Sequence, residues 1–141
     1  GYVGKPKRVD AKLLREIIKE DFIPVIVPMG LDEKGIAYNI NADTAAGAIA
    51  RSIKSRRLML LTDIDGVLDN NEKLIGEINT SEAKELINSQ TIHGGMIPKV
   101  KTCIDAINNG VRAVVILDGR KPHSILFELF SDKGSGTLIR K

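Results

Sequence analysis

Short apolar runs alternate along this chain with segments whose apolar residues recur at helical spacing, and this alternation constrains the fold more than any other feature. The three clearest runs are residues 23–29 (IPVIVPM), 58–62 (LMLLT) and 111–117 (VRAVVIL). Short runs rich in Val, Ile and Leu are typical of strands buried on both faces of a parallel sheet. The sequence therefore predicts an α/β fold with a mainly parallel sheet sandwiched between helices.

Local signals place the remaining elements. Leu13, Leu14, Ile17 and Ile18 repeat as one helical face, and residues 31–36 predict a hairpin turn with Gly35 in the left-handed region. A hydroxyl of the Thr80–Ser81 pair is expected to cap the helix predicted at about residues 81–89. Helices are expected at about 44–54, 81–89, 96–108 and 122–130, with a short strand or loop at 74–78 and a last short strand at 137–139. In α/β sheets ligands bind beyond the carboxyl ends of the strands, here after Met29, Thr62 and Leu117.

Composition narrows the classes of function. The 141 residues suffice for one domain with its own core, and the net charge is only +3. Trp is absent and no long Lys/Arg block occurs, so nucleic-acid binding is a weak hypothesis, while a phosphate-bearing small molecule fits the charge equally well.

Cysteine usage and apolar runs bear on the compartment. Cys103 is the single cysteine, so no internal disulfide is possible, and its helical position predicts a buried, inert thiol in a reducing compartment. No apolar run approaches the roughly 18 residues of a membrane span, and no signal peptide is visible. The chain begins at Gly1 without an initiator Met and is expected to be a piece of a longer protein.

An Asn/Asp motif lies where a strand is expected to become a helix. Asn39, Asn41 and Asp43 alternate at every second position, which in a strand places three polar side chains on one face. Such a face could hold a small polar ligand. The alternative is helix capping, with Asn41 as the N-cap and Asp43 in the first turn, facing the positive end of the helix dipole.

A glycine pair opens the helix expected from residue 96. Gly94 and Gly95 would leave free backbone N–H groups for close approach to a phosphate, with Lys99 in the first turn. On a helical wheel, Lys99 and Lys101 lie on opposite sides of the apolar stripe, so the pattern does not say which lysine faces a ligand. Both could instead be solvated. No Walker A or G-x-G-x-x-G pattern follows a strand, no nucleophile elbow is present, and no metal-ligand spacing occurs, so no metal site is predicted.

Three strings together carry a resemblance to a known family. Residues 38–43 (YNINAD), 60–68 (LLTDIDGVL) and 94–99 (GGMIPK), in this order and spacing, resemble the amino-acid kinase family. The similarity covers essentially all 141 residues and is strongest to the branch that acts on N-acetyl-L-glutamate. It implies that residues 1–141 form a single domain, the ATP-binding C-terminal half of such a kinase, with the N-terminal substrate half absent.

The resemblance also implies a role for each matching residue. Asn39 and Asn41 would bind the substrate, Asp43 would orient the catalytic lysines, and Lys99 would neutralise phosphate charge at the transition state. Arginine, as an inhibitor, would bind near Glu128, Gly134 and Gly136, although Glu128 could equally be an ordinary charge on a helix surface. The nucleotide site would comprise Thr62, Asp63, Gly66, Val67, Leu68, Thr91, Ile92, His93, Gly95 and Met96.

The activity implied is ATP-dependent phosphorylation of the side-chain carboxylate of N-acetyl-L-glutamate, with Mg2+ bridging phosphate oxygens. This is a step of arginine biosynthesis and implies a cytoplasmic homo-oligomer, a dimer or hexamer, without nucleic-acid or membrane partners. The family carries a second catalytic lysine and a Gly-rich loop in its other half, so this chain alone is expected to be inactive. The alternatives are another amino-acid kinase, acting on aspartate, glutamate or uridylate, and a non-catalytic module that binds nucleotide or arginine.

Overall fold

The alternation of strands and helices expected from the sequence is present in the structure, a computed structural model that describes residues 2–141. In chain order the elements are β1 (Val3–Gly4), α1 (Ala11–Lys19), β2 (Met29–Leu31), β3 (Ala37–Ile40), α2 (Ala42–Ile53), β4 (Arg57–Thr62), β5 (Glu77–Asn79), α3 (Thr80–Asn88), α4 (Met96–Asn108), β6 (Ala113–Asp118), α5 (Ser124–Phe130) and β7 (Gly136–Arg140). Helix α4 has the bounds that its apolar spacing predicts, with Asn109 as its C-cap and Gly110, at φ +105°, directly after it.

The main sheet has four strands in the order β4-β6-β7-β5. Strands β4 and β6 are parallel, β5 and β7 are parallel, and β7 runs antiparallel to β6. Because β4 and β6 are in register from Arg57↔Ala113 to Thr62↔Asp118, their carboxyl ends lie side by side. The register Leu117↔Gly136 brings the start of β7 to the same edge. The predicted α/β class with a largely parallel sheet is confirmed.

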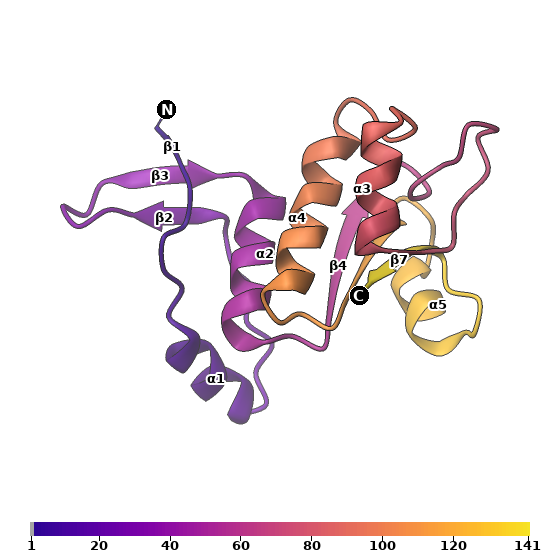
Figure 1. The fold of residues 1–141 in the computed structure, drawn as a ribbon. Coiled ribbons are helices and arrows are strands. Elements are labelled where there is room, and N and C mark those ends of the chain that lie inside the picture. The colour runs from indigo at the N-terminus through magenta and orange to yellow at the C-terminus, as the bar shows by residue number, and fades with distance from the viewer. Residues whose placement is uncertain (1) are drawn as a thin grey trace.

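Helices lie on both faces of this sheet. Helices α2, α3 and α4 pack over one face (Figure 1), where Leu60, Ile116 and Ile139 meet Val100 and the other buried residues of α4 in the main core. Helix α5 lies against the other face, because Glu128 of α5 pairs with Arg57, whose side chain points away from the face of its neighbour Leu58. Thus the apolar strands are enclosed mainly by the α2–α4 layer.

Helices α2 and α4 pack closely because α2 is built from small residues. A Cβ added to Gly47 would lie 3.0 Å from the Thr102 methyl carbon, and Ala48 and Ala50 are buried. Toward the C-terminal part of both helices, Arg51 and Asp105 form an ion pair. The contact brings the first turns of α2 and α4 together at one end, the end where β4 and β6 finish (Figure 1).

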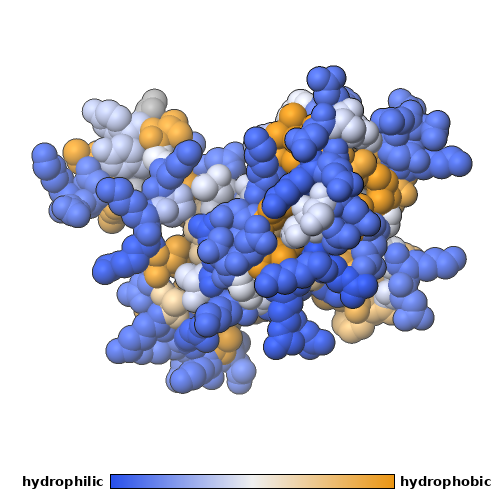
Figure 2. Space-filling view, viewed as in Figure 1, coloured by the Kyte–Doolittle hydropathy of each residue, from blue (hydrophilic) through white to orange (hydrophobic). Residues whose placement is uncertain are grey.

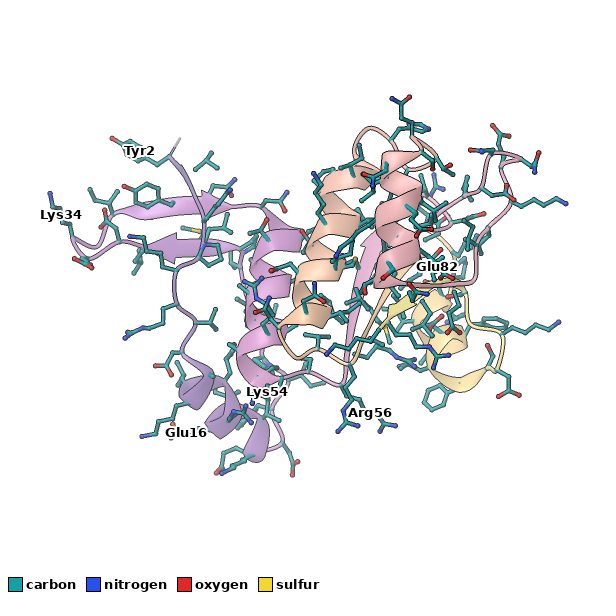
Figure 3. All side chains as sticks on the ribbon, in the orientation of Figure 1. Tyr2, Glu16, Lys34, Lys54, Arg56 and Glu82 are labelled. Carbon is teal, nitrogen blue, oxygen red and sulfur yellow. The ribbon has the colours of Figure 1, made fainter. Side chains whose placement is uncertain are left out.

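A second, three-stranded sheet has the order β1-β3-β2 and projects from the main sheet (Figure 1). Its hairpin confirms the predicted turn: Gly35 has φ +77°, and Lys34 lies at the tip (Figure 3). The Asp32 carboxylate accepts hydrogen bonds from the Ile36 and Lys34 amides. The Ile36 bond is the main reason that the pKa of Asp32 is below its usual value.

The predicted buried strand at residues 23–29 is wrong. Only Met29 is in a strand, and the side chains of Ile23 and Val25 are 90% and 93% exposed. Pro24 and Pro28 lack amide hydrogens, and none of the strands described in residues 2–141 pairs with residues 23–27; only the Pro28 carbonyl, next to β2, accepts from the Ile40 amide of β3 at 2.9 Å. An apolar run becomes a buried strand only where another layer covers it, and the run itself does not carry that information.

Two helix starts and one helix face also differ from expectation. Helix α3 is capped by Asn79 through a capping box with Glu82, not by a hydroxyl of Thr80 or Ser81. The strand β5 ends directly at Asn79, so the chain turns one residue earlier than the hydroxyls. Helix α5 begins at Ser124, after the left-handed His123, rather than at Pro122. On α1, Leu14 and Ile17 are half-buried, whereas Leu13 and Ile18 are exposed.

The surface is mixed in character. Figure 2 shows hydrophilic residues over most of the face in view, with hydrophobic residues in separate patches between them. Among residues 2–141, none of the helices has the length and apolar content needed to cross a bilayer.

Candidate functional site

The centre of the candidate site is an ion pair between the first turns of two helices. The Lys99 ammonium of α4 donates a hydrogen bond of 2.6 Å to Oδ2 of Asp43 in α2. The two side chains are 16% and 26% exposed, so the pair is largely shielded but reaches solvent. The carboxylate fixes the direction of the ammonium, whose other N–H groups have no bond to residues 2–141.

Lys101 differs from Lys99 in this respect. Its side chain is exposed, and no ion pair or hydrogen bond joins it to the described residues. The ambiguity between the two lysines in the sequence is thus resolved by the packing of α4 against α2, which turns Lys99 toward Asp43.

Asn39 and Asn41 flank the same site at the junction of β3 and α2. Asn41 is the N-cap of α2, and its side-chain oxygen accepts from the Thr44 amide at 3.1 Å. The capping hypothesis for Asn41 and for Asp43 in the first turn is therefore confirmed. The Asn39 side chain is exposed, while Ile40 between the two points the other way and is buried. Asn39 is thus available to a ligand in a way that the oxygen of Asn41 is not.

The polar loop after β4 is held against β7. Thr62 ends β4, and its carbonyl oxygen accepts from the Gly119 amide at 2.8 Å. Val67 is 1% exposed and donates its amide to the Thr137 hydroxyl at 2.8 Å, whereas Asp63 is exposed. Leu68 bridges to Leu74 as the loop closes.

The segment before α4 forms a second loop at this edge, because α4 runs back from it toward the start of β6 (Figure 1). Ile92 is buried, with its amide bonded to the Leu86 carbonyl, and His93 is exposed. Thr91 shares a hydroxyl–hydroxyl bond with Ser89, and Met96 is half-buried.

Two of the backbone N–H groups that follow the glycine pair are already hydrogen-bonded, although the sequence predicts free N–H groups here. The Met96 and Ile97 amides donate to the carbonyls of His93 and Gly94, both at 3.3 Å, so they are not free N–H groups. Gly94 has φ +56°, which explains a glycine there. Gly95 has φ −65°, and a Cβ on it would meet no atom within 4 Å. The fold does not require a glycine at 95, and the space beside it is open.

Charged residues after β6 join the site and were missed in the sequence. Arg120 binds both oxygens of the buried Asp118, at 3.0 and 2.9 Å. These bonds lower the pKa of Asp118 to about 2. Lys121 pairs with Asp65 of the loop after β4 at 2.6 Å. The only signal in the sequence was the polar segment after residue 117, at the carboxyl end of a predicted strand. That signal does not show which charged residues pair with one another.

Glu128 is not a surface charge. Its side chain is buried, and Oε2 accepts from the Ser135 amide at 2.8 Å while Oε1 faces Arg57 at 3.6 Å. Gly134 has φ +66°, and a Cβ there would lie 2.7 Å from Glu128 Oε2. Gly136 packs directly on the Ile116 backbone. Glu128, Gly134 and Gly136 are thus brought together by the turn that leads into β7, and all three have a structural role in it.

Cys103 takes no part in the exposed site. It is fully buried on α4, and burial raises the pKa of its thiol to about 12, with the nearby Asp43 adding to the effect. The expected buried, inert thiol is confirmed. In the described part of the chain, no three His, Cys, Asp or Glu side chains gather where they could hold a metal ion.

Comparison with known proteins agrees with this geometry. Over all 141 residues the chain is 59% identical to the acetylglutamate kinase of Pelagibacter ubique and 53% identical to that of Bradyrhizobium sp.. It covers 49% and 47% of those two proteins, so it spans about half the length of the curated relatives it matches.

Solved structures show the same arrangement of elements. N-acetylglutamate synthase from Neisseria gonorrhoeae, in complex with coenzyme A and L-arginine, is 28% identical with a TM-score of 0.93. That likeness covers 100% of this chain and 33% of the synthase. Carbamate kinase from Giardia lamblia bound to AMP-PNP has the same fold at a TM-score of 0.74 and 22% identity, over 99% of this chain and 47% of the kinase.

The profile of the amino acid kinase family matches residues 1–118, which include the Asn/Asp motif, the loop after β4 and Lys99. The chain belongs to the amino acid kinase family.

Proposed function

We propose that this chain is the ATP-binding half of an acetylglutamate kinase, which phosphorylates the side-chain carboxylate of N-acetyl-L-glutamate. The curated relatives at 59% and 53% identity carry that name, which favours this substrate over aspartate, glutamate or uridylate. The observation that carries the proposal is the Lys99–Asp43 pair, which presents a fixed cation at the edge where the sheet's polar loops gather.

The reaction explains why the site needs a cation but no general base. The acceptor carboxylate is already ionised, so its oxygen attacks the γ-phosphorus directly, and the bond from that phosphorus to the oxygen bridging to the β-phosphate breaks. The products are an acyl phosphate and ADP. Negative charge grows on the transferred group and on the leaving phosphate, and Lys99 stabilises that charge. Asp43 positions Lys99 without joining the bond changes.

The remaining site residues divide between the two substrates. Asn39 and Asn41 are assigned to N-acetyl-L-glutamate because they flank the pair at the end of β3, with the Asn39 side chain exposed. The loops 62–68 and 91–96 are assigned to the nucleotide because they lie at the carboxyl edge of the main sheet, where α/β folds bind ligands. The open space beside Gly95 fits the close approach of a phosphate to backbone.

The described residues do not form a protein cage for Mg2+, because no three suitable side chains meet. This donor set fits an ion that arrives with the nucleotide, since Mg2+ is commonly held by substrate phosphates with few protein ligands. Bound in that way, it would neutralise phosphate charge beside Lys99.

Two further assignments belong to this proposal. Arginine is proposed as an inhibitor that binds near Glu128, Gly134 and Gly136, and the similar synthase was solved with L-arginine bound. The buried Glu128 carboxylate has the charge to bind a guanidinium, although it already faces Arg57. A biosynthetic, ATP-dependent kinase of this kind is proposed to work in the cytoplasm as a homo-oligomer.

The test is calorimetric titration of the chain with Mg2+-ADP, in the wild type, Lys99→Ala and Lys101→Ala. Binding is the readout because the chain covers only 49% of the Pelagibacter relative. Loss of a charged partner to phosphate costs about 1.5–3 kcal/mol, so Lys99→Ala should weaken binding at least about tenfold. Lys101 is the matched control, on the same helix but exposed, and its loss should leave the Kd within about twofold.

Circular dichroism and urea unfolding of all three proteins establish that each is folded. Equal weakening by both lysine variants would mean that the chain attracts ADP only through its general positive charge. Absence of binding in a folded wild type would refute the nucleotide site in this chain.

A further inference from the structure

Thr137 places a hydroxyl group inside the apolar core. It lies on β7 opposite Ile116, on the same face of the strand as Ile139, and all three residues are fully buried. A valine would have nearly the same shape and no polar atom. Because an unpaired buried hydroxyl is costly, the partners of this group show what the threonine does.

Both partners lie in the loop that follows β4. The Thr137 hydroxyl accepts a hydrogen bond from the Val67 amide at 2.8 Å and donates one to the Ile75 carbonyl at 2.7 Å. Ile75 in turn donates its amide to the Val67 carbonyl at 2.9 Å. We call these two bonds of the hydroxyl the Thr137 bridge. The bridge joins both arms of the loop 66–75 to a residue more than 60 positions away in sequence.

The loop approaches the bridge too closely for any side chain to intervene. Gly66 has φ +149°, and a Cβ on it would lie 2.6 Å from the Thr137 hydroxyl oxygen and 2.8 Å from the Leu74 Cδ1 atom. On its exposed side the loop is held by the ion pair of Asp65 with Lys121. The backbone at Gly66 and Val67 is therefore placed by β7 and by the segment after β6, in addition to the bond from Ile75 within the loop.

We propose that Thr137 is a positioning residue for the nucleotide: its hydroxyl holds the backbone of residues 66–68 in the conformation that contacts the bound nucleotide. This inference rests on the proposed function, which assigns that loop to the nucleotide. Thr137 is fully buried beneath the loop and does not touch the ligand, so it acts only through Val67 and Ile75.

Three variants of the full 141-residue chain separate positioning from simple stability. Thr137→Val removes both hydrogen bonds and keeps the shape, whereas Thr137→Ser keeps the hydroxyl and removes a methyl group. Ile139→Val is the matched control, because it removes one methyl group from the same face of the same strand and leaves both hydrogen bonds of the Thr137 bridge in place. Each is titrated calorimetrically with Mg2+-ADP, and its stability is measured by urea unfolding.

Thr137→Val removes both hydrogen bonds of the bridge and should raise the Kd for Mg2+-ADP at least about threefold. Thr137→Ser should stay within about twofold of the wild type, and Ile139→Val should bind normally even where it is less stable. Wild-type affinity in a folded Thr137→Val would overturn the inference while leaving the nucleotide site intact. The inference would also be overturned if Thr137→Ser or Ile139→Val weakened Mg2+-ADP binding as much as Thr137→Val does, because the loss of the hydroxyl would then not be the cause. A wild type that binds no nucleotide would instead refute the proposed function, and this inference with it.

A second measurement needs only the wild type and applies even where Thr137→Val does not fold. Amide hydrogen exchange should show the Val67 amide strongly protected in the free chain, unlike that of the exposed Asn70 of the same loop, and more protected with Mg2+-ADP. Exchange of Val67 as fast as that of Asn70, or protection unchanged at saturating Mg2+-ADP, would overturn the inference.

Discussion

Single side chains at the carboxyl edge of the main sheet act through partners far away in sequence. Lys99 and Asp43 are 56 positions apart, and the Thr137 hydroxyl reaches Val67 across 70. Asp118 differs, since its partner Arg120 is only two residues on in the sequence, yet this contact lowers the pKa of Asp118 to about 2. Each of these contacts joins a charge or hydroxyl to a group that would otherwise be partly desolvated and unpaired.

Asp118 makes stability depend on acid pH. Its folded pKa of about 2 lies below its usual 3.8, so its contribution to stability is complete above about pH 4 and is lost as the pH falls toward 2. In Arg120→Ala the pKa of Asp118 should rise, because the hydrogen bonds from the Arg120 guanidinium are the main cause of its lowered value. Carboxyl-carbon NMR titration of both proteins measures this directly. An unchanged midpoint in the variant would show that the backbone amide, not the guanidinium, controls the carboxyl group.

At the scale of elements, capping residues determine where α2 and α3 begin, and small side chains determine how closely α2 packs against α4. Asn41 starts α2 and thereby places Asp43 in the first turn, while the small residues of α2 let α4 approach it. The cap of α2 was predictable because an Asn directly precedes a helical pattern. The cap of α3 was not, because Asn79, Thr80 and Ser81 can all cap and the decision depends on where β5 leaves its neighbour β7.

The competing caps of α3 can be tested by two alanine substitutions. Asn79→Ala should lower the free energy of unfolding by about 1 kcal/mol, because the amides of Ser81 and Glu82 lose their acceptor. Thr80→Ala at the next position should change it by no more than about 0.5 kcal/mol. Urea unfolding monitored by circular dichroism compares the two. A larger loss of unfolding free energy in Thr80→Ala than in Asn79→Ala would show that the Thr80 hydroxyl caps the helix.

For the whole molecule, burial distinguishes apolar runs that look alike in sequence. Residues 23–29 and 113–118 are both rich in Val and Ile, yet Ile23 is 90% exposed and Ile116 is fully buried. Strand β6 lies between β4 and β7 and beneath α4, whereas residues 23–27 have no strand partner among the described residues. The core therefore lies around β6 and α4.

The same substitution in the two runs measures this difference. Ile116→Ala should cost about 2–5 kcal/mol of unfolding free energy, because it leaves a cavity in the centre of the sheet. Ile23→Ala should change it by no more than about 0.5 kcal/mol. Urea unfolding of both variants gives the comparison. A cost for Ile23→Ala above about 2 kcal/mol would show that residues 23–29 are buried in solution after all.

The sequence by itself determined the helices and most of the strands, the α/β class, the bounds of α4, the cap of α2 and the residue strings of an amino acid kinase. These follow from local periodicity, capping chemistry and motif spacing, which operate over a few residues. Only the tertiary structure decided that Lys99 rather than Lys101 meets Asp43, that Glu128 is buried and that Arg120 and Lys121 enter the site. It also decided that residues 23–27 pair with none of the described strands. Those outcomes depend on which segments that are distant in sequence pack together, and such contacts produce no periodic pattern in the sequence.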